Sequence, residues 1–363
     1  MDDPEGHRFA YSYDGMNLVQ RWHQPSMTAD LVHSSSDYYY TEYDSFGNTL
    51  YIRNRIGKYI KYSYDNLSRL TKQEPVDNAD SSIITYRYDL VGRLLRAEQG
   101  QESIRFTYDG SGNVLTETSS IGEVRSWYDA AGRRTKLGDP TPSIFYPDTI
   151  PKVYIDYQYD VLNRLTLVKE VLVQPNPNYE WQPESEGGSY IARYSYNNLR
   201  KRARVLQGYS PDRGIDNAYS YETGSHLTKI TRNLDGTETT NDSVLELTRN
   251  GAGQIQIRSQ SNDRYAFTEL SNVNRTYAVN RLNQYVEAGA LNFIYDGRGN
   301  LVDDGTDRTY SYDARNRLKQ MVKSGIDGYV VNLRYDPLGR LSQISGGPEG
   351  GSQIPVGWRQ VDW

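Results

Sequence analysis

Apolar and aromatic residues alternate with polar ones in short stretches along most of the chain. Examples are Ile84-Tyr86-Tyr88, Ile104-Phe106-Tyr108, Val153-Ile155-Tyr157-Tyr159 and Leu291-Phe293-Tyr295. Residues two apart lie on the same face of a β-strand, so each stretch predicts a strand with one apolar face. Apolar residues at helical spacing are scarce. We therefore expect a nearly all-β chain with no helix longer than about two turns.

Many of these stretches end in the dipeptide Tyr-Asp. A catalytic pair is expected once or twice in a chain, because an active site needs one set of tuned groups, whereas an architectural pair recurs wherever the same shape is built. The period is about 20 residues, and such self-similarity outweighs a motif reading of any single copy. Tyr-Asp therefore indicates architecture rather than chemistry. It occurs at Tyr13, Tyr43, Tyr64, Tyr88, Tyr108, Tyr128, Tyr159, Tyr295, Tyr312 and Tyr335.

Each Tyr-Asp pair is followed by a turn signal. Asp at the first turn position accepts a hydrogen bond from a backbone N–H two residues on, and Gly three residues later tolerates a positive φ. Together they predict a type I turn closed by a left-handed residue, after which Leu or Val begins the return strand of a hairpin. The predicted structural turn residues are Asp44, Asp65, Asp89, Asp109, Asp129, Asp160, Asp296, Asp313 and Asp336, with Gly47, Gly92, Gly112, Gly132, Gly299 and Gly339.

Some copies depart from this pattern but keep its frame. Ser68, Asn163 and Asn316 stand in the place of the glycine. Degenerate copies with the Asp position replaced align at Asn197, Glu222, Asn250 and Asn280. The array is therefore expected to continue through the middle of the chain.

The recurrent unit Y-x-Y-D-x-x-G-[RN]-L resembles the RHS/YD-repeat family of bacterial polymorphic toxins, toxin-complex shell subunits and teneurins. The resemblance extends from Tyr11 to Ile344 and is especially close in YAVNRLNQYVEAGALNFIYDGRGNLVDDGTDRTYSYDARNRL, residues 277–318. It implies hairpins paired side by side into a single curved, spiralling sheet, either an open band or part of a hollow shell. In that family the shell often encloses a toxic C-terminal domain.

The expected organisation is an N-terminal segment at residues 1–10, a YD-repeat array at 11–344 and a C-terminal tail at 345–363. Two insertions rich in Pro, Gly and acidic residues, at 138–152 and 174–189, predict loops at hairpin tips. The tail lacks the family's self-cleaving closing segment, no effector domain follows it, and nothing before Tyr11 resembles a plug. We therefore expect a fragment or short member of a longer shell.

A length estimate points to partners. About fourteen hairpins at about 4.8 Å per strand give a strip roughly 130 Å long, which is about one turn of a band. Unless such a band closes on itself, its two end strands are unpaired and invite pairing. The chain is therefore expected to be a monomeric open band or an edge-paired dimer.

Composition narrows the function classes. The 33 Tyr against 6 Phe fit aromatic faces whose hydroxyls reach water or a hydrogen-bond partner. A net charge of −5 argues against a general nucleic-acid or anionic-membrane binder. No stretch is apolar enough to span a bilayer, no signal peptide is present, and the lack of Cys excludes disulfides and cysteine-zinc sites. No cofactor motif and no clustered metal ligands occur, so we expect no cofactor and no metal.

The remaining candidate sites have a simpler structural explanation beside the functional one. Tyr179 and Trp181, in the second insertion, indicate either local packing or a ligand-contact loop. Arg200, Arg202 and Arg204 on one predicted strand face indicate a solvated salt-bridge face more readily than a polyanion stripe. The stretch 109–117 loosely resembles a calcium loop, but its spacing is wrong for one and the same frame recurs as the turn repeat.

Three function classes remain open. The first is a structural module that builds part of a shell or stalk enclosing, presenting or delivering another polypeptide, such as a toxin. The second is an extracellular module that binds carbohydrate or a cell-surface glycan through Tyr faces. The third is a glycosidase-type hydrolase, which needs two carboxylates about 5 to 10 Å apart. Since no single carboxylate pair stands out, we expect no enzymatic activity, and a secreted or cell-surface location as part of a longer exported precursor.

Overall fold

The computed structural model describes residues 2–3, 6–26, 31–76, 83–120, 122–138, 153–172, 190–208, 214–224, 226–234, 239–265, 275–325, 328–348 and 354–357. The chain divides into two compact units. Unit 1 combines Met1–Phe106 with Val273–Trp363, and unit 2 is Thr107–Asn272. Each unit is described by itself.

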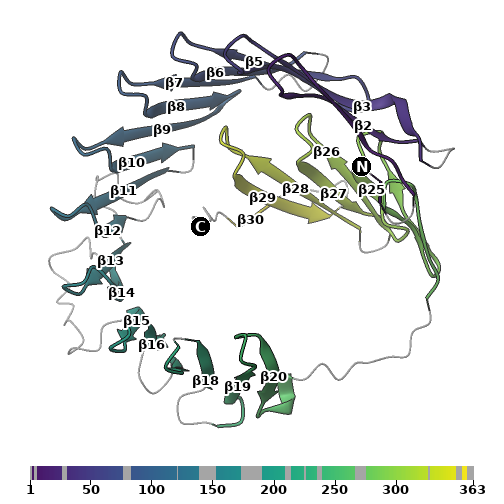
Figure 1. Ribbon diagram of the computed structural model, residues 1–363. Helices are drawn as coiled ribbons and strands as arrows, with labels where there is room; N and C mark the ends of the chain where they lie inside the picture. Colours follow the sequence, from purple (N-terminus) through teal and green to yellow (C-terminus); the bar gives the residue numbers. More distant parts are fainter. Residues whose placement is uncertain are drawn as a thin grey trace. The chain divides into compact units, whose positions relative to one another are not determined.

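The first part of unit 1 is a run of antiparallel strands in which each strand pairs with the next along the chain. Successive strands therefore form hairpins side by side (Figure 1). The strands are β1 (Ala10–Tyr13), β2 (Val19–Pro25), β3 (His33–Tyr43), β4 (Thr49–Arg53), β5 (Tyr59–Tyr64), β6 (Leu70–Pro75), β7 (Ile84–Tyr88), β8 (Leu94–Gln99) and β9 (Glu102–Tyr108).

The second part of unit 1 forms two smaller antiparallel sheets of three and seven strands. The three-stranded sheet holds β21 (Tyr277–Val279), β22 (Tyr285–Ala288) and β23 (Leu291–Asn292). The seven-stranded sheet holds β24 (Ile294–Tyr295), β25 (Leu301–Asp303), β26 (Arg308–Tyr312), β27 (Leu318–Lys323), β28 (Tyr329–Tyr335), β29 (Leu341–Pro348) and β30 (Ile354–Gly357). Residues beyond Ile344 thus continue the sheet, because β30 pairs with β29.

Unit 2 repeats the same arrangement, each strand from β10 to β20 pairing antiparallel with the next. Its strands are β10 (Val114–Ser119), β11 (Gly122–Tyr128), β12 (Arg134–Gly138), β13 (Val153–Tyr159), β14 (Leu165–Leu172), β15 (Tyr190–Tyr196), β16 (Arg202–Gln207), β17 (Ile215–Tyr221), β18 (Leu227–Asn233), β19 (Ser243–Arg249) and β20 (Ile255–Gln260).

The predicted all-β class is confirmed. Within the described ranges the one helical element is a 3-10 turn, Asp263–Tyr265, and no helix is long and apolar enough to cross a membrane. The repeat pattern explains this outcome, since alternating residues fit a pleated surface and a turn signal ends each stretch after a few residues.

The buried core is thin, as expected for a sheet built from hairpins. In unit 1 it centres on Ile84, Ala97 and Ile104, which are 3%, 0% and 1% exposed. Ala97 lies opposite Ile104 on the neighbouring strand and opposite Tyr86 on the other. Side chains at such paired positions share a face, so Tyr86, Ala97 and Ile104 form one row across β7, β8 and β9, and Ile84 lies on the same face of β7 two residues before Tyr86.

The first residues of the chain fold back on themselves. Arg8 donates two hydrogen bonds to the Asp2 carboxylate, at 2.7 and 2.9 Å. The Asn283 side-chain amide donates to the Asp3 carboxylate at 3.0 Å, which links the chain start to the turn between β21 and β22 within unit 1. The insertion at 174–189 and all but Gly138 of the insertion at 138–152 lie outside the described residues.

Candidate functional site

The Tyr-Asp turn has the same backbone hydrogen bonds in every predicted copy, and the turn at Asp89 shows them with an arginine at the fourth position; at Asp44, Asp109 and Asp296 an Asn amide takes the place of that arginine. The Asp89 Oδ1 accepts the backbone N–H groups of Val91 and Arg93, at 3.0 and 2.8 Å. Its Oδ2 accepts the Arg93 Nε–H at 2.6 Å. The Asp89 N–H donates to the Arg93 carbonyl and the Gly92 N–H to the Asp89 carbonyl. One carboxylate therefore holds the whole turn.

The other predicted aspartates occupy the same position and accept from the backbone N–H groups two and four residues on. They are Asp44, Asp65, Asp109, Asp129, Asp160, Asp296, Asp313 and Asp336.

The residue three positions after each aspartate has a positive φ. Glycine adopts this left-handed conformation without a Cβ penalty, and Asn tolerates it better than most residues. The values are Gly47 82°, Gly92 91°, Gly112 92°, Gly132 77°, Gly299 93° and Gly339 84°, with Ser68 57°, Asn163 62° and Asn316 62° in the glycine's place.

In eight of the described copies the tyrosine before the turn links its own hairpin to the preceding one. Its hydroxyl donates to the backbone carbonyl of the first residue of the preceding return strand. The hydrogen bond therefore connects the end of a strand in one repeat to the start of a strand in the repeat before it. The pairs are Tyr43 to Val19 (2.9 Å), Tyr88 to Leu70 (2.9 Å), Tyr128 to Val114 (2.8 Å), Tyr159 to Arg134 (2.9 Å), Tyr196 to Leu165 (2.8 Å), Tyr221 to Arg202 (2.8 Å), Tyr295 to Tyr285 (2.8 Å) and Tyr335 to Leu318 (2.9 Å).

The arginine that closes a turn completes the link. The Arg69 guanidinium lies 5.0 Å from the centre of the Tyr88 ring and donates to the Asp89 carbonyl at 2.8 Å. A cation over an aromatic face is attracted by the ring quadrupole. The same stacking recurs for Arg133 on Tyr159 (4.9 Å), Arg164 on Tyr196 (4.4 Å) and Arg317 on Tyr335 (4.5 Å).

This inter-repeat contact, here called the Tyr-Asp-Arg staple, consists of a turn aspartate, its arginine at the fourth position and the tyrosine of the following repeat. Sequence reasoning identified the turn but not the staple. The missing signal was the fixed offset: each of these tyrosines bonds the residue five positions after the first residue of the preceding turn, which is an Asp in most copies and Asn197 or Asn280 in the others. That offset can be read only when two repeats are considered together.

Copies in which the Asp or the Tyr is replaced make the same hydrogen bonds with a different side chain. Asn197 accepts the backbone N–H groups of Leu199 and Lys201 through its Oδ1, both at 3.0 Å. Where the tyrosine position holds Arg249, its guanidinium donates to the Leu227 carbonyl, which is the acceptor that a tyrosine has in other repeats.

One turn escaped the sequence search because no Tyr-Asp precedes it. Asn54 accepts the Lys58 N–H through its Oδ1 at 2.9 Å, and Gly57 has a φ of 83°. It connects β4 to β5, so it lies at the opposite edge of the sheet from the turns at Asp44 and Asp65. The signal available was Asn-x-x-Gly between two alternating stretches.

In the turns, hydrogen bonds and burial move the pKa values of the carboxyl and phenol groups away from neutral pH. The Arg133 guanidinium and its backbone N–H hold the pKa of Asp129 below its ordinary value, and the Asn113 amide and N–H do the same for Asp109. Burial raises the pKa of the Tyr88 and Tyr335 phenols. Both shifts move the groups away from neutrality, whereas a general acid or base works best with a pKa near the working pH.

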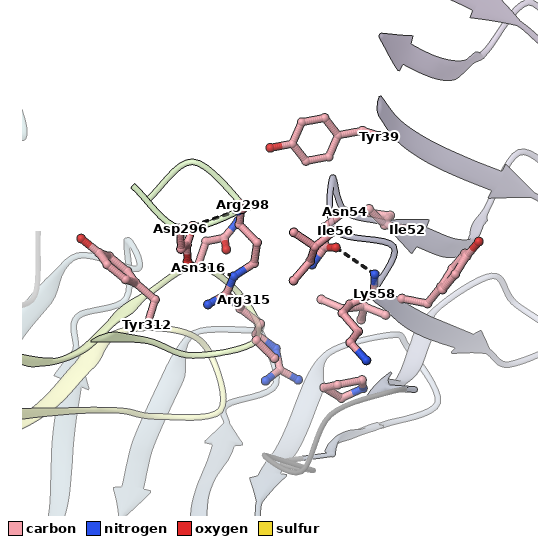
Figure 2. Close-up of a pocket in the computed structure, with 15 residues that line it drawn as sticks. Tyr39, Ile52, Asn54, Ile56, Lys58, Asp296, Arg298, Tyr312, Arg315 and Asn316 are labelled. Atoms are coloured by element: carbon pink, nitrogen blue, oxygen red, sulfur yellow. Dashed lines mark hydrogen bonds and ion pairs between the residues drawn. The ribbon is translucent and has the colours of Figure 1, made fainter. Parts of the chain in front are cut away.

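A pocket of about 450 Å³ lies within unit 1, between the turn at Asn54 and the turns at Asp296 and Asp313. Figure 2 shows Asn54, Ile56 and Lys58 facing Asp296, Arg298 and Arg315. The approach is close. A Cβ added to Gly297 would lie 2.5 Å from the Ile56 Cγ2, and one added to Gly299 would lie 2.9 Å from an Arg55 guanidinium nitrogen.

The pocket lining holds one carboxylate. Although burial raises the pKa of Asp296, hydrogen bonds from the Asn300 side chain and backbone N–H bring the net pKa below its ordinary value. Asp296 also meets the Arg298 guanidinium at 3.3 Å. The lining contains neither a second carboxylate nor His, Ser or Thr, so it offers no acid-base pair for hydrolysis. Across the described ranges, no group of His, Cys, Asp and Glu could hold a metal ion.

Two further candidates can be located. Tyr179 and Trp181 lie outside the described residues. The proposed arginine face is not formed, because Arg200 occupies the left-handed turn position with a φ of 60°. Arg202 lies 5.2 Å from the Tyr194 ring centre, and Arg204 pairs with Asp216 at 2.8 and 2.5 Å. The salt-bridge interpretation therefore describes Arg204.

Comparison with known proteins adds the family. The family model described as Teneurin YD-shell matches residues 19–235. A crystal structure of TcdB2-TccC3-TEV is 15% identical in sequence, with a TM-score of 0.42. The match covers 94% of this chain and 20% of the chain in that structure. A Tc holotoxin pore structure from Photorhabdus luminescens is 14% identical in sequence, with a TM-score of 0.41. The match covers 95% of this chain and 23% of the chain in that structure.

The chain thus spans about one fifth of the length of the solved structures that it matches. No curated protein is similar enough to match. The family match covers well over half of the 363 residues and confirms the resemblance drawn from the repeats. The chain therefore belongs to the Teneurin YD-shell family.

Proposed function

We propose that this chain is a wall element: a structural YD-repeat module that builds part of a shell or stalk enclosing, presenting or delivering another polypeptide. The observation that carries the proposal is the Tyr-Asp-Arg staple, which joins one hairpin to the next through Arg69 and Tyr88, Arg133 and Tyr159, Arg164 and Tyr196, and Arg317 and Tyr335. Its cation and phenol are committed to neighbouring repeats. Side chains used in this way extend a sheet, and they leave no tuned group for turnover.

The family match supports the same structural role, because the family is described as a YD-shell. The partner in this proposal is an enclosed effector or the remaining segments of a longer shell, and the location is secreted or cell-surface as part of an exported precursor. The chain itself acts as a monomeric band or an edge-paired dimer and has no enzymatic activity of its own. Neither nucleic acid nor a membrane span has a role.

The test is protease protection in the natural gene product. A wall function predicts that one polypeptide segment outside the repeats survives digestion while the repeats are folded, and is digested once mild denaturant opens them. Tyr88→Phe combined with Tyr335→Phe should lower the denaturant concentration at which protection is lost. Digestion of every non-repeat segment at the same rate before and after opening would overturn the proposal.

The alternative, a carbohydrate-binding module, rests on stacked aromatic rings at one end of unit 1. The Trp22 ring stacks on Tyr11 and Tyr39, at 6.1 and 5.2 Å between ring centres, and both Trp22 and Tyr11 are partly exposed. A glycan array decides it: binding that is lost in Trp22→Ala favours the recognition module. A panel of glycosidase and esterase substrates alongside tests the absence of turnover.

A further inference from the structure

Three arginines stand in line across three neighbouring strands of unit 1. Arg87 of β7 is paired in register with Arg96 of β8, and Arg96 is paired in register with Arg105 of β9. Residues at paired positions have side chains on the same face. Neighbouring strands lie about 4.8 Å apart, so the row, here called the arginine row, is about 10 Å long.

The arginine row occupies the face opposite the apolar core. Successive side chains along a strand point to opposite faces, and Ile84, Tyr86, Ala97 and Ile104 alternate with the arginines. Arg87 and Arg105 are exposed and Arg96 is half-buried. The guanidinium groups at both ends of the row are therefore open to a partner in solution.

Within the described part of the chain, the row is compensated at its centre alone. Among the residues that the structure describes, neither Arg87 nor Arg105 has an ion-pair or side-chain hydrogen-bond partner. Arg96 pairs with Glu98 on its own strand, while its Nε is buried without a hydrogen-bond partner. Like charges directly opposite each other destabilise a sheet, and a buried donor without an acceptor adds to the cost.

Elsewhere the sheets place opposite charges at paired positions. Lys61 lies opposite Glu74, Lys229 lies opposite Glu246, and Asp156 lies between Lys136 and Lys169. One other like-charged pair is described, Arg308 with Lys323, and there Asp307 lies 3.8 Å from the Lys323 ammonium. Like-charged side chains at paired positions destabilise the sheet, and the rest of the described fold avoids them or compensates them. Their presence here indicates a ligand whose binding offsets the repulsion.

The chemistry of the row selects among anionic ligands. Its neighbours on the same face are Thr85, Glu98 and Ser103, whereas single-stranded nucleic acid binds where aromatic side chains flank the cations. In an extended peptide, acidic side chains on one face are about 6.7 Å apart, which does not match the spacing of about 4.8 Å between neighbouring arginines of the row. On a helix, carboxylates three or four residues apart are separated by about 5 to 6 Å, which matches it.

We propose that Arg87, Arg96 and Arg105 form a docking site for an acidic helical segment of another polypeptide, laid across the strands. Three carboxylates on one face of the helix pair with the three guanidinium groups, and the Thr85 and Ser103 hydroxyls border the contact. The inference goes beyond the wall function and does not require it, since a wall without this site would still enclose its cargo.

The experiment uses the full chain and two synthetic peptides at low ionic strength, followed by fluorescence anisotropy. One helical peptide carries three Glu residues four positions apart on one face, and its isomer has the same composition with the Glu residues spread around the helix. The first peptide should bind more tightly than the isomer. Its binding should weaken as salt is added, because exposed charges are screened.

Arg87→Gln combined with Arg105→Gln should weaken that binding about tenfold, from two lost ion pairs. A control at another exposed strand arginine is Arg204→Gln in unit 2, where the arginine already has Asp216; it should leave the affinity unchanged. Equal binding of the two peptides, equal loss in the control, or no binding at all would overturn the proposal. So would binding of polyglucuronate at the row in place of the peptide.

A stability measurement separates a docking site from a structural row. If the row exists to bind, removing one arginine relieves repulsion, so Arg105→Gln should keep or raise the Tm, by up to about 2 °C. The control Arg204→Gln should keep or lower it. A lower Tm in Arg105→Gln would show that the row stabilises the sheet, and the proposal would fail.

Discussion

The turn at Asp89 in unit 1 and the turn at Asn250 in unit 2 build the same shape from different residues. At Asp89 a carboxylate accepts two backbone N–H groups and an arginine, and Tyr88 reaches back to the Leu70 carbonyl. At Asn250 an amide oxygen accepts the N–H groups of Ala252 and Gln254, and Arg249 reaches back to a carbonyl. The hydrogen bonds persist while the charges change.

The comparison teaches which properties of the repeat matter. An acceptor is needed at the first turn position, a left-handed residue three positions later, and a donor before the turn that reaches the preceding hairpin. A negative charge at the first position is dispensable, since Asn197, Asn250 and Asn280 serve there. A catalytic role would instead have required the carboxylate itself.

The largest effect is expected at the left-handed position. Gly112→Val should destabilise the protein by about 1 to 3 kcal/mol, because a β-branched residue is strained at a φ of 92°. Gly110→Val, in the same turn, is the control: its φ is not left-handed and an added Cβ would meet nothing within 4 Å at either site. Thermal melting of both variants decides, and equal Tm values would remove the left-handed requirement.

Gly339→Val should behave like Gly112→Val. An added Cβ there would lie 3.8 Å from the Arg317 guanidinium, which is ordinary contact. A loss restricted to one of the two glycines would mean that the turns are not equivalent.

The next largest effect concerns the donor before the turn. Tyr88→Phe and Tyr159→Phe should each destabilise by about 0.5 to 1.5 kcal/mol, because each loses one hydrogen bond to a carbonyl of the preceding hairpin. Tyr86→Phe is the control, since no hydrogen bond is described for its hydroxyl. Denaturant unfolding gives the values, and a cost for Tyr86→Phe equal to the other two would remove the staple from the account.

A smaller effect is expected from replacing the carboxylate. Asp89→Asn, Asp313→Asn and Asp336→Asn should each cost less than about 1 kcal/mol and resemble one another, because the amide oxygen keeps the backbone hydrogen bonds and only the partly buried ion pair with the arginine of the same turn weakens. Asp89→Ala, which has no acceptor, should cost more. If a measured activity disappears in one Asn variant alone, that copy has been recruited for chemistry.

The smallest effect is a pH dependence at one turn. The pKa of Asp129 is lowered in the folded state, so its contribution is complete above the ordinary value of 3.8 and is lost as the pH falls through the lowered pKa. The Tm difference between wild type and Asp129→Asn should therefore shrink as the pH falls below 3.8. A difference that stays constant across this range would mean that the charge of Asp129 is not coupled to folding.

The sequence predicted the parts of the fold that are local. Asp89 and Gly92 are three residues apart, so a single repeat is enough to predict its turn. The alternation before Asp89 indicates a strand. The turn at Asn54 was missed because it lacks the Tyr-Asp dipeptide, although its Asn-x-x-Gly spacing was present. Within unit 1 the expected single sheet is interrupted at Phe293, which divides the alternating stretch 291–295 into β23 and β24 of two different sheets, and the alternation does not predict this break.

The parts that depend on register were beyond the sequence. Arg87, Arg96 and Arg105 are nine residues apart, and they meet only because a bulge at Tyr88 and the tight turn at Gly100 align their strands. The pocket needs Ile56 to approach Gly297, residues joined by no local rule. Such contacts follow from packing between hairpins, which the repeat pattern leaves undefined.

The central claim is that the repeated side chains fasten one hairpin to the next. A double-mutant cycle of Arg69→Met with Tyr88→Leu measures this coupling directly, with Arg69→Met and Tyr335→Leu as the control, since Tyr335 stacks with Arg317. The account predicts a coupling free energy of about 0.5 to 2 kcal/mol for the first pair and none for the control. Independent, additive costs for Arg69 and Tyr88 would contradict it.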